Sequence, residues 1–192
     1  MSSVSIALEN TLTLPGSRER VWTLMTDVPQ VVPCIPGGRL VASVSDSSWK
    51  AEVALDLGFT RVVFLADVAQ READEEAGRA VLEITAVDSK GKSTARATMA
   101  SQLAPSDGGT EVTVHTDLTM EGEVARFGSG IIEDVSYEIV EQMAGCLRDR
   151  LSEPLHAADE PPPASRKLSL WSALLLFVRG RLHRRRRRQA SR

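Results

Sequence analysis

Aromatic side chains are scarce in this chain, whose 192 residues include three Trp, one Tyr and four Phe. A core with so few large rings leaves space between its elements, which favours a protein with an interior cavity. Hydrophobic residues make up 42% of the sequence and charged residues 26%, as in ordinary globular domains. The composition therefore predicts a folded domain with room for an apolar guest.

Histidine is equally scarce, with only His115, His156 and His183 available for acid–base chemistry. His115 occupies an odd position in a strand whose even positions are apolar, so we expect it to face solvent. No histidine is spaced for a metal site, and no glycine-rich phosphate loop is present. These absences argue against an enzyme and against a resident metal.

Cysteine occurs only twice, as Cys34 and Cys146, in contexts that share no spacing motif. Such usage argues against a disulfide framework or a zinc knuckle and is typical of a reducing compartment. Cys34 lies between two prolines without a neighbouring base, which predicts an inert, packed thiol. The N-terminus has no charged and apolar leader, so we expect a cytoplasmic protein.

Acidic residues are absent after position 160, and this gap divides the chain. Residues 1–160 carry a net charge of −13, whereas residues 161–192 carry +10. So large an asymmetry predicts an acidic domain with an interaction tail. We expect a domain over 1–153, a proline-rich linker over 154–166 and a basic, apolar tail over 167–192. Three consecutive prolines make that linker a stiff spacer.

Hydrophobic periodicity predicts an α+β domain. Apolar residues alternate at even positions from Val4 to Leu14, which indicates a half-buried strand, and two short helical segments follow. A loop is expected at Glu72–Gly78, and apolar spacings of three and four predict a long helix from Gly122 to Leu151. Short connections favour antiparallel neighbours. The six later strands are expected at 40–44, 49–58, 61–68, 80–87, 93–103 and 112–120.

Three motifs resemble one known family. They are Pro33-Cys34-Ile35-Pro36-Gly37 after the second helix, Gly109-Thr110-Glu111-Val112-Thr113-Val114 before the last strand, and Phe127-Gly128-Ser129-Gly130-Ile131-Ile132 at the long helix. With the element order, they resemble the CoxG family of carbon monoxide dehydrogenase subunits, which belongs to the START-like (SRPBCC) superfamily. The resemblance implies a helix-grip fold: a curved seven-stranded antiparallel sheet around a long C-terminal helix, with two short helices after the first strand.

The resemblance also implies a non-catalytic role. A CoxG-like protein is expected to hold a hydrophobic molecule such as a quinone, without a covalent cofactor, and to link a carbon monoxide dehydrogenase-type molybdenum hydroxylase to the cytoplasmic leaflet of the membrane. The alternative is an adaptor, recruitment or maturation factor for the hydroxylase that binds no small molecule. Cyclases and hydrolases of the superfamily are a third class, which the lack of an acid–base pair disfavours.

A helix-grip fold supplies a cavity between sheet and helix, and eight apolar residues are its candidate lining, although each could simply belong to the core. Gly128 and Gly130 near the helix start are explained by a bulky guest or by close helix–sheet packing. The candidate ligand-binding residues are Phe59, Phe64, Met99, Met120, Phe127, Ile131, Val135 and Ile139.

The tail combines an apolar block at 168–178 with an arginine cluster. The block is too short for a spanning helix, which needs about 20 residues. Trp171 suits the headgroup level and arginines suit anionic lipid, so a membrane surface is favoured over a groove on a partner protein, and both over nucleic acid. The candidate membrane-binding residues are Leu168, Trp171, Leu174, Leu175, Phe177, Val178, Arg179, Arg181, Arg184, Arg185, Arg186, Arg187 and Arg188.

Overall fold

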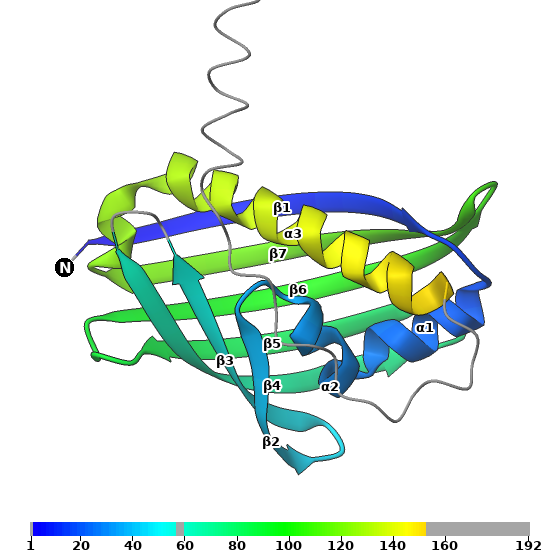
Figure 1. Ribbon diagram of the computed structural model, residues 1–192, viewed down its shortest axis with the longest axis horizontal. Helices are drawn as coiled ribbons and strands as arrows, with labels where there is room; N and C mark the ends of the chain where they lie inside the picture. Colours follow the sequence, from blue (N-terminus) through cyan, green and yellow to red (C-terminus); the bar gives the residue numbers. More distant parts are fainter. Residues whose placement is uncertain (1, 57–59, 153–192) are drawn as a thin grey trace, which may run out of the picture.

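Seven antiparallel strands form one curved sheet in the order β1-β7-β6-β5-β4-β3-β2, and a long helix crosses one face of it (Figure 1). The computed structural model describes residues 2–56 and 60–152. The predicted α+β helix-grip architecture is confirmed. In chain order the elements are β1 (Ser3–Leu14), α1 (Arg18–Thr26), α2 (Val28–Val31), the 3-10 helix η1 (Val32–Cys34), β2 (Gly38–Ser45), β3 (Ser48–Asp56), β4 (Arg61–Asp74), β5 (Arg79–Asp88), β6 (Ser93–Ser106), β7 (Gly109–Gly122), the 3-10 helix η2 (Val124–Phe127) and α3 (Ser129–Ser152).

The first strand pairs with the last one in an unbroken register. β1 and β7 run antiparallel from the Ser3–Glu121 pair to the Leu14–Thr110 pair. Because successive side chains of a strand point to opposite faces, the even residues of β1 face α3. Leu14 is fully buried at the end of this row, as the alternating sequence pattern predicts.

Side-chain caps and one glycine fix the segment between β1 and β2. Ser17 Oγ accepts a hydrogen bond from the Arg20 backbone N–H at 3.4 Å, and Asp27 Oδ1 accepts one from the Gln30 N–H at 3.2 Å. These contacts satisfy donors at the starts of α1 and α2. Gly37 has φ +73°, and a Cβ there would collide with a backbone carbonyl of β3. The turn between η1 and β2 therefore requires glycine.

Two predicted boundaries are wrong. The helix expected from Gly122 begins only at Ser129, because Gly128 adopts φ +81° after η2 and breaks the helical path. The loop expected from Glu72 begins later, because β4 continues to Asp74 and pairs there with Arg79 of β5. Both corrections lie at element ends, where hydrophobic periodicity carries the least information.

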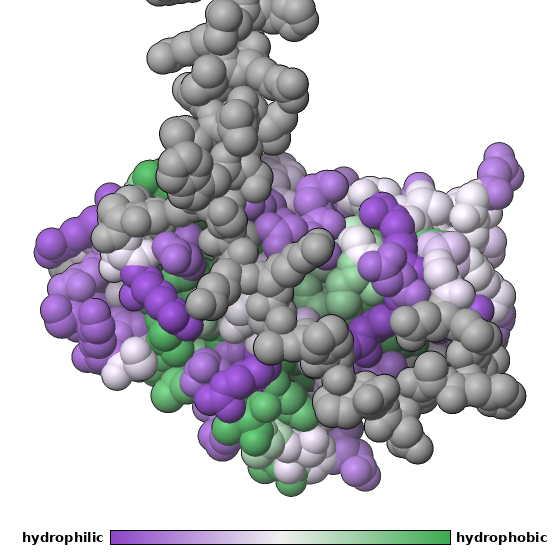
Figure 2. All heavy atoms as spheres, in the orientation of Figure 1, coloured by the Kyte–Doolittle hydropathy of each residue, from purple (hydrophilic) through white to green (hydrophobic). Residues whose placement is uncertain are grey.

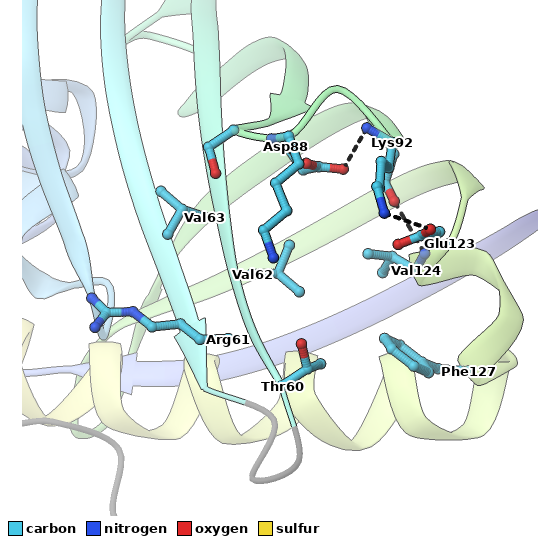
Figure 3. A pocket seen from close by; sticks show the side chains of 12 residues that line it. Thr60, Arg61, Val62, Val63, Asp88, Lys92, Glu123, Val124 and Phe127 are labelled. Atoms are coloured by element: carbon cyan, nitrogen blue, oxygen red, sulfur yellow. Dashed lines mark hydrogen bonds and ion pairs between the residues drawn. The ribbon is translucent and has the colours of Figure 1, made fainter.

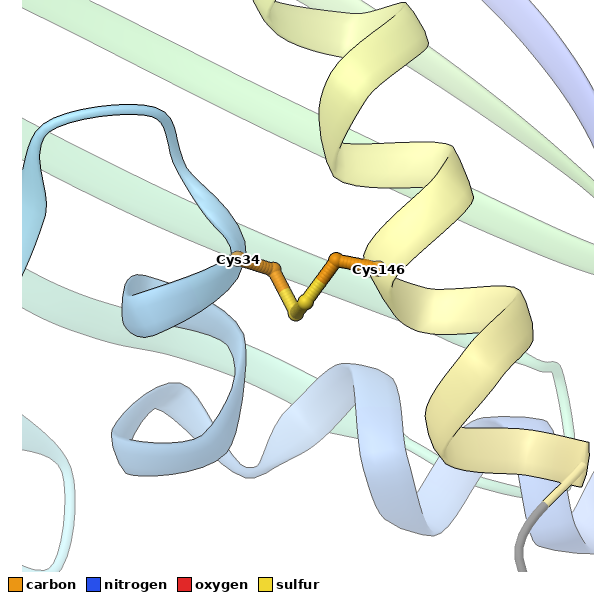
Figure 4. Close-up of a disulfide and its surroundings, with 2 residues drawn as sticks. All are labelled: Cys34 and Cys146. Carbon is orange, nitrogen blue, oxygen red and sulfur yellow. A yellow bond between two sulfur atoms is a disulfide. The ribbon is translucent and has the colours of Figure 1, made fainter. Parts of the chain in front are cut away.

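The two cysteines form a disulfide, which contradicts the prediction of free thiols. Cys34 at the end of η1 and Cys146 in α3 are 112 residues apart in sequence, and their Cα atoms lie 5.4 Å apart (Figure 4). The fold brings η1 against α3, a proximity that sequence spacing cannot reveal. Cys34 is packed as expected, but it is not a thiol, and the inference of a reducing compartment loses its basis.

The core is divided along the sheet. The largest cluster lies between α1, the C-terminal half of α3 and the adjoining strand ends, around Leu14, Val21 and Leu147. A second cluster gathers around Phe64, Met120 and the start of α3. A third lies under α2 and β3. The first cluster holds the fully buried side chain of α3, Leu147, so that end is the better packed.

Candidate functional site

The inner face of the sheet, which is the face toward α3, is apolar but incompletely covered. Alternate positions on its strands carry large hydrophobic side chains that remain half-buried rather than buried. On α3 itself only Ile132, Ala144, Leu147 and Leu151 are buried. The helix therefore seals the sheet near its C-terminal end and less well near its start. The half-buried inner-face residues at that less sealed end include Val4, Ile6, Leu55, Val62, Ile84 and Leu118.

Three of the candidate ligand-binding residues come together at this end. Phe64 and Met120 are buried in one cluster, and Phe127 packs half-buried against it. Phe64 projects from β4, Met120 from β7 and Phe127 from η2, so the sheet curvature and the turn into α3 unite them. Buried residues of this kind form the floor of a site rather than its accessible lining.

The remaining candidates are dispersed. Met99 packs against the other cluster, beside α1 and the C-terminal half of α3. Val135 and Ile139 are half-buried along α3, whereas Ile131 is 43% exposed. Phe59 lies outside the described residues, as do all the candidate membrane-binding residues of the tail. The structure therefore divides the predicted lining into a floor, a helix stripe and one separate residue.

A small pocket opens at the end of the sheet beside η2. It measures about 70 Å³ and lies between the start of β4, the β5–β6 turn and η2 (Figure 3). Val62, Val124 and Phe127 provide its apolar wall, and Lys92 and Glu123 contribute to its polar rim. A drug-sized ligand needs about 300–1,000 Å³, so this pocket alone cannot enclose one. It can take one end of a ligand whose remainder lies on the open inner face.

Asp88 organises the polar side of the pocket. This residue is 8% exposed, and its carboxylate accepts hydrogen bonds from the backbone N–H groups of Lys90 at 2.6 Å and Lys92 at 2.9 Å. Burial by itself raises the pKa of Asp88. The N–H groups of Lys90, Ser93 and Lys92 and the Ser93 hydroxyl outweigh it, so the pKa lies below its ordinary value. Asp88 is thus an ionised turn-former rather than a proton donor.

Ser93 and Lys92 connect this turn to the start of α3. Ser93 is buried, and its Oγ accepts a hydrogen bond from the Val124 N–H at 3.1 Å. Lys92 Nζ forms an ion pair with Glu123 at 3.2 Å. Sequence reasoning missed this group, although Asp88 followed by serine, lysine and glycine is a turn signal.

Acid–base and metal chemistry find no support in the part of the chain that the structure describes. His115 is exposed on the outer face and lies 3.1 Å from Glu9, as its odd position predicts. No group of three or more potential metal ligands occurs within residues 2–56 and 60–152. None of the helices described there carries an apolar stretch long enough to cross a bilayer. The arrangement offers surface for binding rather than groups for catalysis.

The two glycines near the helix start are not explained by close packing. A Cβ at Gly128 or Gly130 would meet no described atom within 4 Å. The positive φ of Gly128 accounts for that glycine through backbone conformation. Nothing in the structure explains Gly130.

The fold matches that of solved helix-grip proteins. A conserved protein from Geobacillus kaustophilus is 18% identical, with a TM-score of 0.65 over 79% of this chain and 95% of its own. The Zhui aromatase/cyclase from Streptomyces sp. R1128 is 11% identical, with a TM-score of 0.56 over 82% and 100%. Ara h 8.0201 is 13% identical, with a TM-score of 0.53 over 78% and 100%. Identities this low establish the fold alone.

The family follows from the sequence match. Residues 12–152 match the model of CoxG, the G-type subunit of carbon monoxide dehydrogenase, and the chain belongs to this family. The matched range includes every described element from the end of β1 to α3. A search of curated proteins gives no significant match.

Proposed function

We propose that this protein is a non-catalytic accessory of a carbon monoxide dehydrogenase-type molybdenum hydroxylase and carries a hydrophobic molecule, a quinone, between its sheet and α3. Family membership supports the association with such an enzyme. The observation that carries the ligand proposal is the apolar inner face that the N-terminal half of α3 leaves half-exposed. Exposed apolar surface of this extent is costly in water unless something covers it.

A quinone suits the mixed character of the site. Its polar ring carbonyls fit the pocket rim near Lys92, and its apolar portion fits Val62, Phe127 and the inner face beyond them. The basic, apolar tail then holds the protein at the cytoplasmic leaflet of the membrane, where quinones dissolve. In this arrangement the protein needs no catalytic group of its own.

Organic extraction of the purified full-length protein followed by mass spectrometry tests the ligand. A quinone at close to one molecule per chain is the expected result. Protein that repeatedly yields no quinone or other lipid, even after incubation with quinone-containing vesicles, contradicts the carrier function.

The small volume of the enclosed pocket favours one alternative: an adaptor that recruits or matures the hydroxylase without a ligand. Co-sedimentation of hydroxylase with vesicles separates the two functions. An adaptor recruits the enzyme equally with quinone-free and quinone-loaded vesicles and leaves electron transfer to quinone unchanged. A carrier is required for that electron transfer even when enzyme and vesicles are both in excess.

A further inference from the structure

One side of α3 has an apolar stripe that the described residues cover only in part. Ile131, Val135 and Ile139 follow one another at intervals of four residues, so they share one side of the helix. Ile131 is 43% exposed, and the other two are half-buried. An apolar helix stripe in a folded domain is ordinarily buried against a partner.

An acidic stripe runs beside it. Asp134, Glu138 and Glu141 are spaced by four and three residues, and all three are exposed. Glu138 accepts a hydrogen bond from the Gln142 amide at 3.3 Å. Within residues 2–56 and 60–152 none of the three carboxylates forms an ion pair. The helix therefore presents apolar surface bordered by uncompensated negative charge.

The disulfide fixes which way the apolar stripe faces. Cys146 lies seven residues after Ile139, on the same side of α3, and is bonded to Cys34 of η1. The stripe therefore faces the side of the sheet from which η1 approaches. Leu55 and Val62 are half-buried on the inner face there. Hydrophobic surface is visible between polar side chains on this side of the molecule (Figure 2).

We propose that the C-terminal segment 168–188 of this same chain binds along α3. Its apolar block, residues 168–178, covers the stripe of Ile131, Val135 and Ile139. Its arginines pair with the carboxylates of the acidic stripe. This inference goes beyond the proposed function, because it assigns the tail a binding site on its own domain.

Charge complementarity selects this occupant. The segment 161–192 has a net charge of +10 and no acidic residue, whereas residues 1–160 have −13. An anionic bilayer is a poor occupant of the same face, because Asp134, Glu138 and Glu141 repel acidic headgroups. Apolar and cationic features occur together in the tail, as do apolar and anionic features on α3.

The connecting chain is long enough to reach. α3 ends at Ser152, and at 1.5 Å per residue Ile139 lies about 20 Å back along the helix and Ile131 about 32 Å. Residues 153–167 extend to about 45 Å in a polyproline conformation. A tether of this length gives an effective concentration on the order of 1 mM, so even weak docking is largely complete within one molecule.

Docking and membrane binding exclude each other, because both use the same apolar block and the same arginines. An anionic membrane therefore competes with α3 for the tail. When lipid takes the tail, the stripe on α3 and the inner face beyond it become accessible.

Photo-cross-linking in the full-length protein tests the docking. Benzoylphenylalanine replaces Ile139, and the same probe at Thr98, on the outer face of β6, is the control. At micromolar protein without lipid, quinone or hydroxylase, the expected product is an intramolecular cross-link from position 139 to residues 168–178. No cross-link to the tail, or cross-links only between chains, overturns the proposal, and the second result assigns the face to another copy.

Charge reversal supplies the second arm. The variant Asp134→Lys/Glu138→Lys/Glu141→Lys is expected to lower the yield of the cross-link at least fivefold. Glu75→Lys/Glu111→Lys/Asp117→Lys makes the same change in net charge away from α3 and is expected to leave the yield unchanged. Equal losses in both variants overturn the role of the acidic stripe. Because no ligand or vesicle is present, failure here is distinguishable from failure of the carrier function.

Discussion

Cys34 and Cys146 join the turn before β2 to the last third of α3, with 5.4 Å between their Cα atoms. The bond divides the helix into a pinned C-terminal part and a less constrained N-terminal part. The pinned part lies over the largest core cluster, whereas Val135 and Ile139 on the other part remain half-buried. Stability and binding surface are thereby assigned to opposite ends of one helix.

Removal of the disulfide is expected to destabilise the domain without unfolding it. Cys34→Ala/Cys146→Ala opens a loop of 112 residues, for which loss of the cross-link costs about 2–4 kcal/mol. Urea denaturation of the full-length protein measures this difference. The wild-type protein in excess dithiothreitol should match the variant. An unchanged midpoint in both experiments contradicts a disulfide in the folded protein.

Asp88→Asn is expected to lower stability by about 1–3 kcal/mol at pH 7, because the amide cannot accept from both turn N–H groups. The lowered pKa of Asp88 means that its ionised form stabilises the fold above its ordinary value of 3.8. That contribution is lost as the pH falls through the lowered folded value. The difference between wild type and variant should therefore shrink below pH 4. Asp117→Asn on the outer face is the control and should be neutral at both ends of the range.

Ala97→Trp is expected to abolish quinone binding with little loss of fold. Ala97 is half-buried on the inner face of β6 and pairs with Ile84 and Leu118, so an indole there fills the space below α3. Thr98→Trp places the same ring on the outer face and should bind like wild type. Quinone recovered per chain by mass spectrometry gives the ratio, which should fall at least tenfold for Ala97→Trp alone. Equal recovery from both variants places the ligand elsewhere.

Replacement of Arg184–Arg188 by glutamine is expected to weaken binding to anionic vesicles by a factor on the order of 10³ at low salt, since each basic residue near such a surface contributes about 1 kcal/mol. Vesicle sedimentation of the full-length protein measures the partition. Neutral vesicles should show a much smaller difference between wild type and variant. A full-length variant that still sediments like wild type with anionic vesicles rules out the arginine cluster as the anchor.

The strands were predictable because their patterns are local. The even-position row from Val4 to Leu14 specifies one buried face, and the β1–β7 register preserves it without a bulge. The start of α3 was not predictable to the residue, because η2 is apolar too and only the φ of Gly128 separates it from the helix.

The candidate site was predictable only in its apolar part. Phe64, Met120 and Phe127 were identified as large apolar residues, and the structure brings them together. The Asp88–Ser93 turn and the Cys34–Cys146 bond depend on which segments meet in space. Such contacts join residues far apart in sequence, and no local pattern encodes them.

The pairing of β1 with β7 has a consequence for how the chain acquires its structure during synthesis. The first strand to leave the ribosome has its partner roughly a hundred residues downstream, at Gly109–Gly122. Until then β1 has an unsatisfied edge, and the sheet can grow only from its other side, by hairpins between consecutive strands. Such non-local closure makes folding slow, and the apolar row of β1 is the segment left longest without cover.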